Sequence, residues 1–242
     1  MILHIPHASQ DIPSYDGYLL SPDRLREEMQ LLTDHYTDEL FRNAEANIIQ
    51  SPCSRIFCDL ERFEDDAQEP MSRVGMGVLY THTDSGEHMR DLNEQLRERI
   101  LDDYYRPHHR RFAAAVDAEL RATGKASIVD CHSYPDRPLK RDLDKRLPRP
   151  DFNIGTDSFH TSKQHIERAS EFFADRGYCL GVDWPYAGSI VPMAHYRKDQ
   201  HVQSIMLEVN RRLYVDEGSG DRLPQFESIR GVVQEFLRAM EF

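Results

Sequence analysis

Clusters of histidines, carboxylates and arginines follow apolar runs of the chain that have the composition of β-strands. In the opening run, strand alternation sends the side chain of His7 to the tip, where it can reach a ligand. In a later run, Asp130 precedes His132 by two residues, so both point to one face of a strand. A carboxylate so placed can fix the tautomer of an imidazole, and Asp130 is therefore predicted to orient His132. A solvated loop histidine is the alternative in each case.

Two further clusters add carboxylates at strand ends. Residues 54–62 carry Asp59 and Glu61 after an apolar stretch, although a surface salt bridge also explains acids there. Glu208 lies inside the apolar run 205–209, where an unpaired carboxylate is costly. Its side chain must face a metal, a hydrogen-bonding partner or water, which makes Glu208 the strongest single candidate for a functional residue.

The residue types of these clusters suit a catalytic zinc ion, which commonly takes two histidines and a carboxylate and keeps one position open. His7 and His132 are the histidine candidates, and either Asp59 or Glu61 supplies the carboxylate. Zinc lowers the pKa of bound water toward ~7 and polarises a carbonyl. Glu208 can then take the water proton and deliver it to a leaving nitrogen. The combination predicts amide hydrolysis.

Three arginines at strand ends can serve the same chemistry. A guanidinium can stabilise an oxyanion or hold a substrate carboxylate through two parallel hydrogen bonds. We predict catalytic roles for Arg55 and Arg62 and a substrate-binding role for Arg211.

Four other side chains are candidates for substrate binding, and each also has a structural explanation. Asn210 shares a strand face with Glu208. Asn153 follows a short strand, but its residue type also caps turns. Tyr186 suits either a pocket wall or an ordinary aromatic turn. His109 falls on the apolar face of its helix, which fits a hydrogen-bonded core histidine equally well.

The elements that must position these residues alternate between strands and helices along the chain. The pattern predicts strands at residues 2–6, 47–50, 56–60, 78–81, 126–130, 152–155, 178–182 and 204–209. It predicts helices from residue 21 to about 43 and at 88–101, 162–176 and 227–240. A turn is expected at Arg106-Pro107, followed by another helix that ends near residue 122. We expect a single three-layer α/β domain over residues 1–242, with a parallel or mixed sheet and ligands beyond the carboxyl ends of its strands. Residues 63–76 and 135–150 lack apolar periodicity and are predicted loops, either of which could be a mobile flap.

The composition narrows the choice of partners. The net charge is −12, and the basic residues are scattered among acids, so we expect no nucleic-acid partner. No apolar run approaches the ~20 residues of a membrane-spanning helix, and the first residues lack the features of a secretory leader. Four cysteines without CxxC spacing indicate reduced thiols. These observations predict a cytoplasmic protein that acts on a small molecule, and they leave the oligomeric state open.

Seven short motifs, taken in their order, resemble the N-formylglutamate amidohydrolase family over nearly the whole chain. The motifs are Ile5-Pro6-His7-Ala8-Ser9, Ser54-Arg55 leading to Asp59-Leu60-Glu61-Arg62, Tyr105-Arg106-Pro107-His108-His109, Asp130-Cys131-His132-Ser133, Asn153-Ile154-Gly155-Thr156, Pro185-Tyr186-Ala187-Gly188 and Leu207-Glu208-Val209-Asn210-Arg211. The resemblance implies a three-layer α/β/α fold similar to that of zinc carboxypeptidases, and one zinc ion. It also implies hydrolysis of N-formyl-L-glutamate to formate and L-glutamate, a step of histidine breakdown. His7 and His132 correspond to two metal ligands of such a site, and Glu208 to its base.

The chain departs from the family pattern near the presumed pocket. The family often has glycine where Ser9 and Ser189 stand, and asparagine where Glu61 stands. Because the pattern tolerates a non-acid at Glu61, Asp59 is the preferred carboxylate ligand. The substitutions leave other hypotheses open: a carboxypeptidase or N-acyl amino-acid deacylase with the same metal centre, or a non-catalytic binding protein with this fold.

Overall fold

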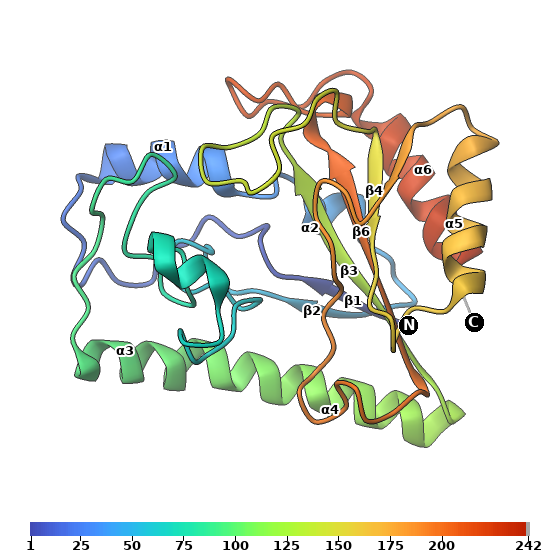
Figure 1. Ribbon diagram of the computed structural model, residues 1–242, viewed down its shortest axis with the longest axis horizontal. Helices are drawn as coiled ribbons and strands as arrows, with labels where there is room; N and C mark the ends of the chain where they lie inside the picture. Colours follow the sequence, from blue (N-terminus) through green and yellow to red (C-terminus); the bar gives the residue numbers. More distant parts are fainter. Residues whose placement is uncertain (241–242) are drawn as a thin grey trace.

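A six-stranded sheet lies at the centre of the computed structural model, which describes residues 1–240 (Figure 1). The strand order is β2-β1-β3-β6-β4-β5. β4 is antiparallel to β6 and the other pairs are parallel, so the sheet is mixed. The strands are β1 (Ile2–Ile5), β2 (Asn47–Gln50), β3 (Ala126–Tyr134), β4 (Phe152–Gly155), β5 (Leu180–Val182) and β6 (Val202–Asn210).

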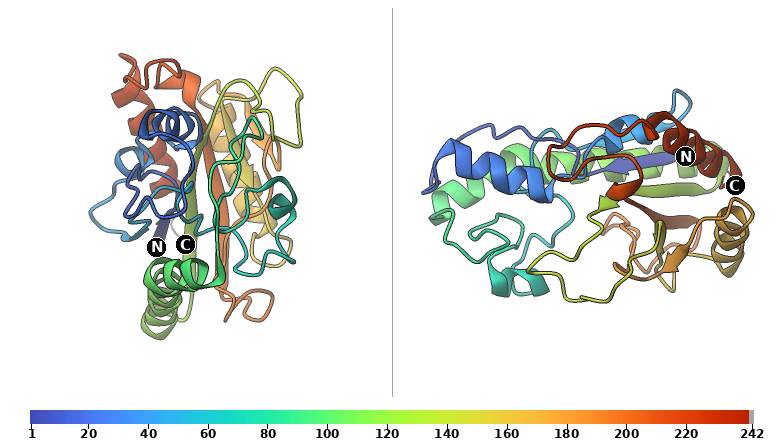
Figure 2. Two further views of the ribbon diagram at one scale, coloured as in Figure 1. Left: turned by 90° about the vertical axis from the view of Figure 1, so that its left-hand side faces the viewer. Right: turned by 90° about the horizontal axis from the view of Figure 1, so that it is seen from above.

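Helices cover both faces of this sheet, which confirms the predicted α/β fold. The helices are α1 (Pro22–Leu32), α2 (Thr37–Leu40), α3 (Glu94–Ile100), α4 (Arg106–Thr123), α5 (Lys163–Ala174) and α6 (Phe226–Ala239), with short 3-10 helices at Pro70–Val74 and Arg211–Leu213. The helices α2, α5 and α6 share an apolar cluster with one sheet face, and α4 packs on the other (Figure 1). The helices α1 and α3 belong to a separate apolar cluster, at the end of the molecule away from α5 and α6 (Figure 2). None of the helices formed by residues 1–240 combines the length and the apolar character needed to cross a bilayer.

Strand alternation sorts the side chains of β3 and β6 between the two faces. Cys131 and Leu207 are buried in the cluster with α5 and α6. Successive strand residues point to opposite faces, so His132 and Glu208 point toward the face that α4 partly covers. On that face α4 contacts the beginning of β3, at Ile128. The carboxyl-terminal half of the same face is therefore left for polar side chains.

Several predicted element bounds are wrong. Residues 56–60 and 78–81 form turns and one isolated bridge instead of strands. Their apolar side chains are buried in the cluster of α1 and α3, so their hydrophobicity reflects packing in that cluster and not pairing in the sheet. The first helix ends at Leu32 instead of running to about 43, because Thr33 adopts an extended conformation. The helix expected from residue 88 starts only at Glu94.

The turn predicted at Arg106-Pro107 is also wrong, since the chain stays helical there. The helix α3 continues through a π-helical turn, Leu101–Tyr105, directly into α4. Proline lacks the N–H that an α-helix interior uses, and here it falls where the hydrogen-bond register changes. Because of this register change, one continuous helical segment extends from the apolar cluster of α1 and α3 to the sheet.

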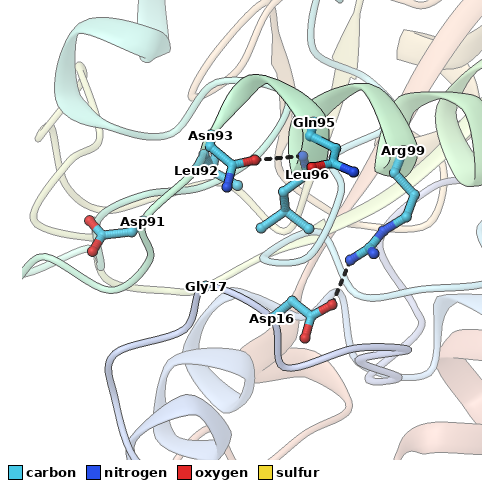
Figure 3. A pocket seen from close by; sticks show the side chains of 8 residues that line it. All are labelled: Asp16, Gly17, Asp91, Leu92, Asn93, Gln95, Leu96 and Arg99. Carbon is cyan, nitrogen blue, oxygen red and sulfur yellow. Dashed lines mark hydrogen bonds and ion pairs between the residues drawn. The ribbon is translucent and has the colours of Figure 1, made fainter.

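Asn93 caps the start of α3, beside a cavity of about 550 Å³ (Figure 3). Its side-chain oxygen accepts a hydrogen bond from the backbone N–H of Leu96 at 2.8 Å. Replacing Asn93 with alanine is expected to lower the free energy of unfolding by about 1 kcal/mol, because a helix-terminal N–H loses its partner. Urea denaturation measures this change. The exposed neighbour Gln95, changed to alanine, is the matched control, and equal destabilisation by both changes would contradict the capping role.

Candidate active site

The carboxyl ends of β1, β3 and β6 open into a polar cavity of about 430 Å³. His7, His132 and Glu208 all line it, so the structure brings together three residues that are far apart in the sequence. The parallel pairing of β3 with β6 places His132 directly beside Glu208. The segment 135–150 forms no helix or strand and, together with residues from 183–187, covers part of the cavity.

His7 and His132 meet around a carboxylate that sequence analysis missed, that of Asp34. One oxygen of Asp34, Oδ2, lies 3.6 Å from Nδ1 of His7 and 3.0 Å from Nδ1 of His132. The two imidazole rings are 5.0 Å apart between centroids. All three side chains are buried, and each offers a possible ligand atom within 4.8 Å of the others. We call His7, Asp34 and His132 the central cluster.

The break between α1 and α2 brings Asp34 to this position. The backbone N–H of Asp34 donates to the carbonyl of His7, which ties the break to the end of β1. The guanidinium of Arg211 donates to the second oxygen of Asp34, Oδ1, at 2.9 Å. Burial would raise the pKa of Asp34, but the neighbouring imidazoles of His132 and His7 hold it well below its usual value. The carboxylate is therefore ionised and fixed in orientation. The signal for this residue in the sequence is that an acid, Asp34, interrupts the apolar pattern of the helix predicted from residue 21 to about 43.

Further carboxylates face the outer nitrogens of the two histidines. Nε2 of His7 is 2.8 Å from Oδ1 of Asp59. Nε2 of His132 lies 3.1 Å from Oδ1 of Asp130 and 3.2 Å from Oε1 of Glu61. A ring proton on Nε2 of His7, donated to Asp59, leaves the lone pair of Nδ1 directed toward the central cluster. Asp59 is thus placed to set the tautomer of His7. Nε2 of His132 has no hydrogen-bond partner within residues 1–240, and the hydrogen bond of this ring joins Nδ1 to Asp34 at 3.0 Å.

The central cluster fits a tetrahedral divalent cation. Nδ1 of His7 is buried and has no hydrogen-bond partner among residues 1–240, so it is free to act as a ligand. Zinc bonds of about 2.0–2.1 Å would separate neighbouring ligand atoms by about 3.3 Å. The spacings of 3.0 and 3.6 Å between Asp34 and the two histidines bracket this value. Within the described chain, two groups of side chains have metal-ligand spacing: the central cluster, and His4 with Glu61 and Asp130. Asp59 belongs to neither group.

Glu208 is the unpaired acid of the cavity. It is 5% exposed, and its Oε2 has no hydrogen-bond partner within residues 1–240. Burial raises the pKa of Glu208 to about 8, with the nearby charge of His132 acting in the opposite direction. A carboxyl group with a pKa near the working pH can both accept and release a proton. Glu208 therefore has the properties of a general acid–base residue.

The three predicted arginines line the cavity, each in contact with a carboxylate. Arg55 donates to Oδ2 of Asp59 at 3.1 Å, and Nε of Arg62 lies 3.5 Å from the same oxygen. Arg211 is buried and also bonds the side chain of Ser133, so its guanidinium supports the central cluster. Arg211 also lines the cavity, and the substrate-binding role expected for it stays a prediction.

The remaining candidates for substrate binding lie in different places. Tyr186 lines the cavity, and its hydroxyl donates to Asp142 at 2.9 Å. Asn153 is fully buried and bonds the backbone carbonyl of Tyr186, so it holds the turn that carries this ring. Asn210 is buried and donates to the carbonyl of Pro150. His109 lies against the ring of Tyr105 and lines a separate cavity of about 560 Å³ beside α4.

A mixed α/β sheet with histidines, carboxylates and arginines gathered at its strand ends defines a class of proteins in which the active site is built beyond the carboxyl edge of the sheet. The model of the N-formylglutamate amidohydrolase family matches residues 1–215, and the chain belongs to this family.

Known proteins share this sequence pattern and fold. The chain is 26% identical over 234 residues to an N-formylglutamate deformylase of Pseudomonas putida, covering 90% of this chain and 82% of that protein. A crystal structure of N-formylglutamate amidohydrolase from Ralstonia eutropha JMP134 superposes with a TM-score of 0.84 at 21% identity, covering 97% of this chain and 90% of that one. A gene product of Agrobacterium tumefaciens gives a TM-score of 0.64 at 19% identity, covering 100% and 91%. The family resemblance seen in the sequence is thereby confirmed.

Proposed function

We propose that this protein is a metal-dependent amidohydrolase that cleaves N-formyl-L-glutamate to formate and L-glutamate. Membership of the family and the name of the Pseudomonas relative support an amidohydrolase acting on this substrate. The observation that carries the proposal is the convergence of His7, Asp34 and His132 beside the unpaired carboxyl of Glu208.

His7, Asp34 and His132 would hold the metal ion. We place Asp34 there instead of Asp59 because Nδ1 of both histidines faces Asp34, whereas Asp59 contacts the opposite nitrogen of His7. A zinc ion supplies Lewis acidity, which makes water nucleophilic near neutral pH and polarises the carbonyl of an amide. Asp59 would then keep the imidazole of His7 in the tautomer that binds metal through Nδ1.

Glu208 would carry the proton through the reaction. It accepts one proton from the attacking water as the new C–O bond forms at the formyl carbon. It then delivers that proton to the amide nitrogen as the C–N bond breaks, which releases formate and the amino group of glutamate. Because Oε2 of Glu208 has no protein partner in the described chain, it is free to make both contacts.

Arg55 and Arg62, which also line the cavity, would bind the substrate. Their guanidinium groups share the Asp59 carboxylate and keep further N–H groups for an oxyanion or a substrate carboxylate. The hydroxyl of Tyr80 donates to the same Asp59 oxygen at 2.7 Å, so Arg55, Arg62 and Tyr80 all face Oδ2 of Asp59. The network holds both arginines in place before substrate binds.

Purified protein is expected to release formate from N-formyl-L-glutamate and to contain about one divalent metal ion per chain. Chelation should remove both the metal and the activity, and added zinc should restore them, because the proposed water activation depends on the ion. Formate dehydrogenase coupling and elemental analysis measure the two quantities.

A substrate panel separates the alternatives. N-acetyl- and N-succinyl-L-glutamate and short peptides are compared with the formyl compound. Cleavage of peptides alone would indicate a carboxypeptidase, and preference for a larger acyl group would indicate a different deacylase. Formate release that persists after complete metal removal would contradict the proposed mechanism.

A further inference from the structure

We propose that Arg141 binds the side-chain carboxylate of the substrate and so gives the enzyme its preference for an acidic amino acid. The proposal rests on the proposed function, since it assigns one end of the substrate of that same site. It starts from the arginines that line the cavity: Arg55, Arg62, Arg141 and Arg211.

Three of these arginines are already neutralised by protein carboxylates. Arg55 and Arg62 face Asp59, and Arg211 pairs with Asp34. A substrate carboxylate that approached them would compete with a fixed, buried negative charge.

Arg141 differs because it forms no ion pair with any acid of residues 1–240. Its Nε donates to the backbone carbonyl of Asp84 at 3.1 Å, and the guanidinium lies beside Gly86. A Cβ atom at Gly86 would come within 2.4 Å of Nη2 of Arg141, so the glycine provides the space that this group occupies. The terminal nitrogens of Arg141 therefore remain available for a ligand.

A buried carboxylate fixes the part of the chain that carries Arg141. The two oxygens of Asp84 accept the backbone N–H groups of Lys140 and Arg141, at 2.9 and 2.8 Å. Asp84 is 4% exposed, and its own N–H donates to Glu28. The segment 135–150, which extends from the end of β3 toward α1 in Figure 1, is thus anchored next to the guanidinium of Arg141.

The chemistry of this arrangement favours a carboxylate ligand. A guanidinium presents parallel N–H groups that match the two oxygens of a carboxylate, and it stays charged at any physiological pH. The central cluster and Arg141 line the same cavity, so one substrate bound there has both within its site. Arg141 lies on the segment that covers the cavity, so a side-chain carboxylate is the group it is placed to bind.

Kinetics with matched substrates test the proposal. N-Formyl-L-glutamate is compared with N-formyl-L-glutamine, which has nearly the same shape and no side-chain charge. Arg141→Met is expected to raise KM for the glutamate compound on the order of 10- to 100-fold, the loss typical of one charged hydrogen-bonded pair. KM for the glutamine compound should change less than about twofold, with kcat maintained for both, because no reacting atom is touched.

The matched control is Arg146→Met, on the same segment. Arg146 pairs with Asp144, lies over the ring of Trp184 and is not among the cavity-lining residues. Its loss should leave both KM values unchanged. Arg141→Lys, which keeps the charge and loses the paired N–H groups, should fall between wild type and Arg141→Met. Equal effects of Arg141→Met on both substrates, or no effect, would overturn the proposal.

Binding of the product by calorimetry separates this inference from the proposed function. Wild-type protein should bind L-glutamate more tightly than L-glutamine, and Arg141→Met should abolish the difference. If this pattern appears without any formate release, the proposed function fails and the role of Arg141 stands. If formate is released but the selectivity does not depend on Arg141, or if wild type binds neither amino acid, the inference on Arg141 is refuted.

Discussion

Glu208→Gln is expected to lower kcat for formate release on the order of 10²- to 10⁴-fold, the range typical of a lost general acid–base residue. Glutamine keeps the shape of the side chain beside His132 but cannot accept the water proton. Metal content should stay near that of wild type, because Glu208 is not part of the central cluster. Single-turnover kinetics and elemental analysis on the same preparation measure both effects.

The control for this change is Glu167→Gln, an exposed acid on α5. It removes the same charge from the chain and should leave kcat unaltered. If Glu208→Gln kept more than about half of wild-type activity with its metal bound, Glu208 would not be the base, and the catalytic proposal would need another proton acceptor.

Asp34→Asn and Asp59→Asn are expected to affect metal binding very differently. Asp34→Asn removes the charged oxygen that faces both histidines, so purified protein should hold less than about a tenth of an ion per chain and show no measurable formate release. Asp59→Asn removes only the partner of the outer nitrogen of His7 and should weaken metal affinity about 10- to 100-fold. Zinc titration against a competing chelator measures both affinities.

Asp59→Asn also leaves Arg55 and Arg62 without their shared carboxylate. Thermal melting of each variant therefore accompanies the zinc titration, to separate a loss of fold stability from a loss of metal affinity. Activity of Asp59→Asn at saturating zinc should recover toward wild type, whereas that of Asp34→Asn should not. The reverse order of metal affinities would show that Asp59 is the ligand, as the sequence alone suggested.

The position of His132 and Glu208 on polar strand faces was within reach of the sequence because it follows from strand periodicity, whereas the pairing of β3 with β6 comes from the structure. Apolar residues such as Cys131 and Leu207 alternate with polar ones in both strands, and this alternation predicts that the polar side chains share a face. The α/β class and the position of the site at the carboxyl edge of the sheet follow from the alternation of strands and helices, whereas the antiparallel direction of β4 does not.

Asp34 and Asp59 could not be placed in the same way. The contact of Asp34 with His7 depends on where the chain turns after α1, and tertiary contacts decide that turn. Asp59 lies in a turn within the apolar cluster of α1 and α3. The residues around it are as buried as those of a strand, although they do not pair with the sheet. In both cases the determining contacts join residues that no local pattern relates.

The alternation of apolar and polar side chains along β6 also bears on the register in which β6 pairs with β3. If β6 paired with β3 one residue out of step, every side chain of the strand would exchange faces. Glu208 would then enter the dry aromatic core beside α5 and α6, and Leu207 would be exposed to the polar cavity. Burying a carboxylate without a partner costs several kcal/mol. The alternation that places Glu208 in the cavity therefore disfavours the shifted register of β6.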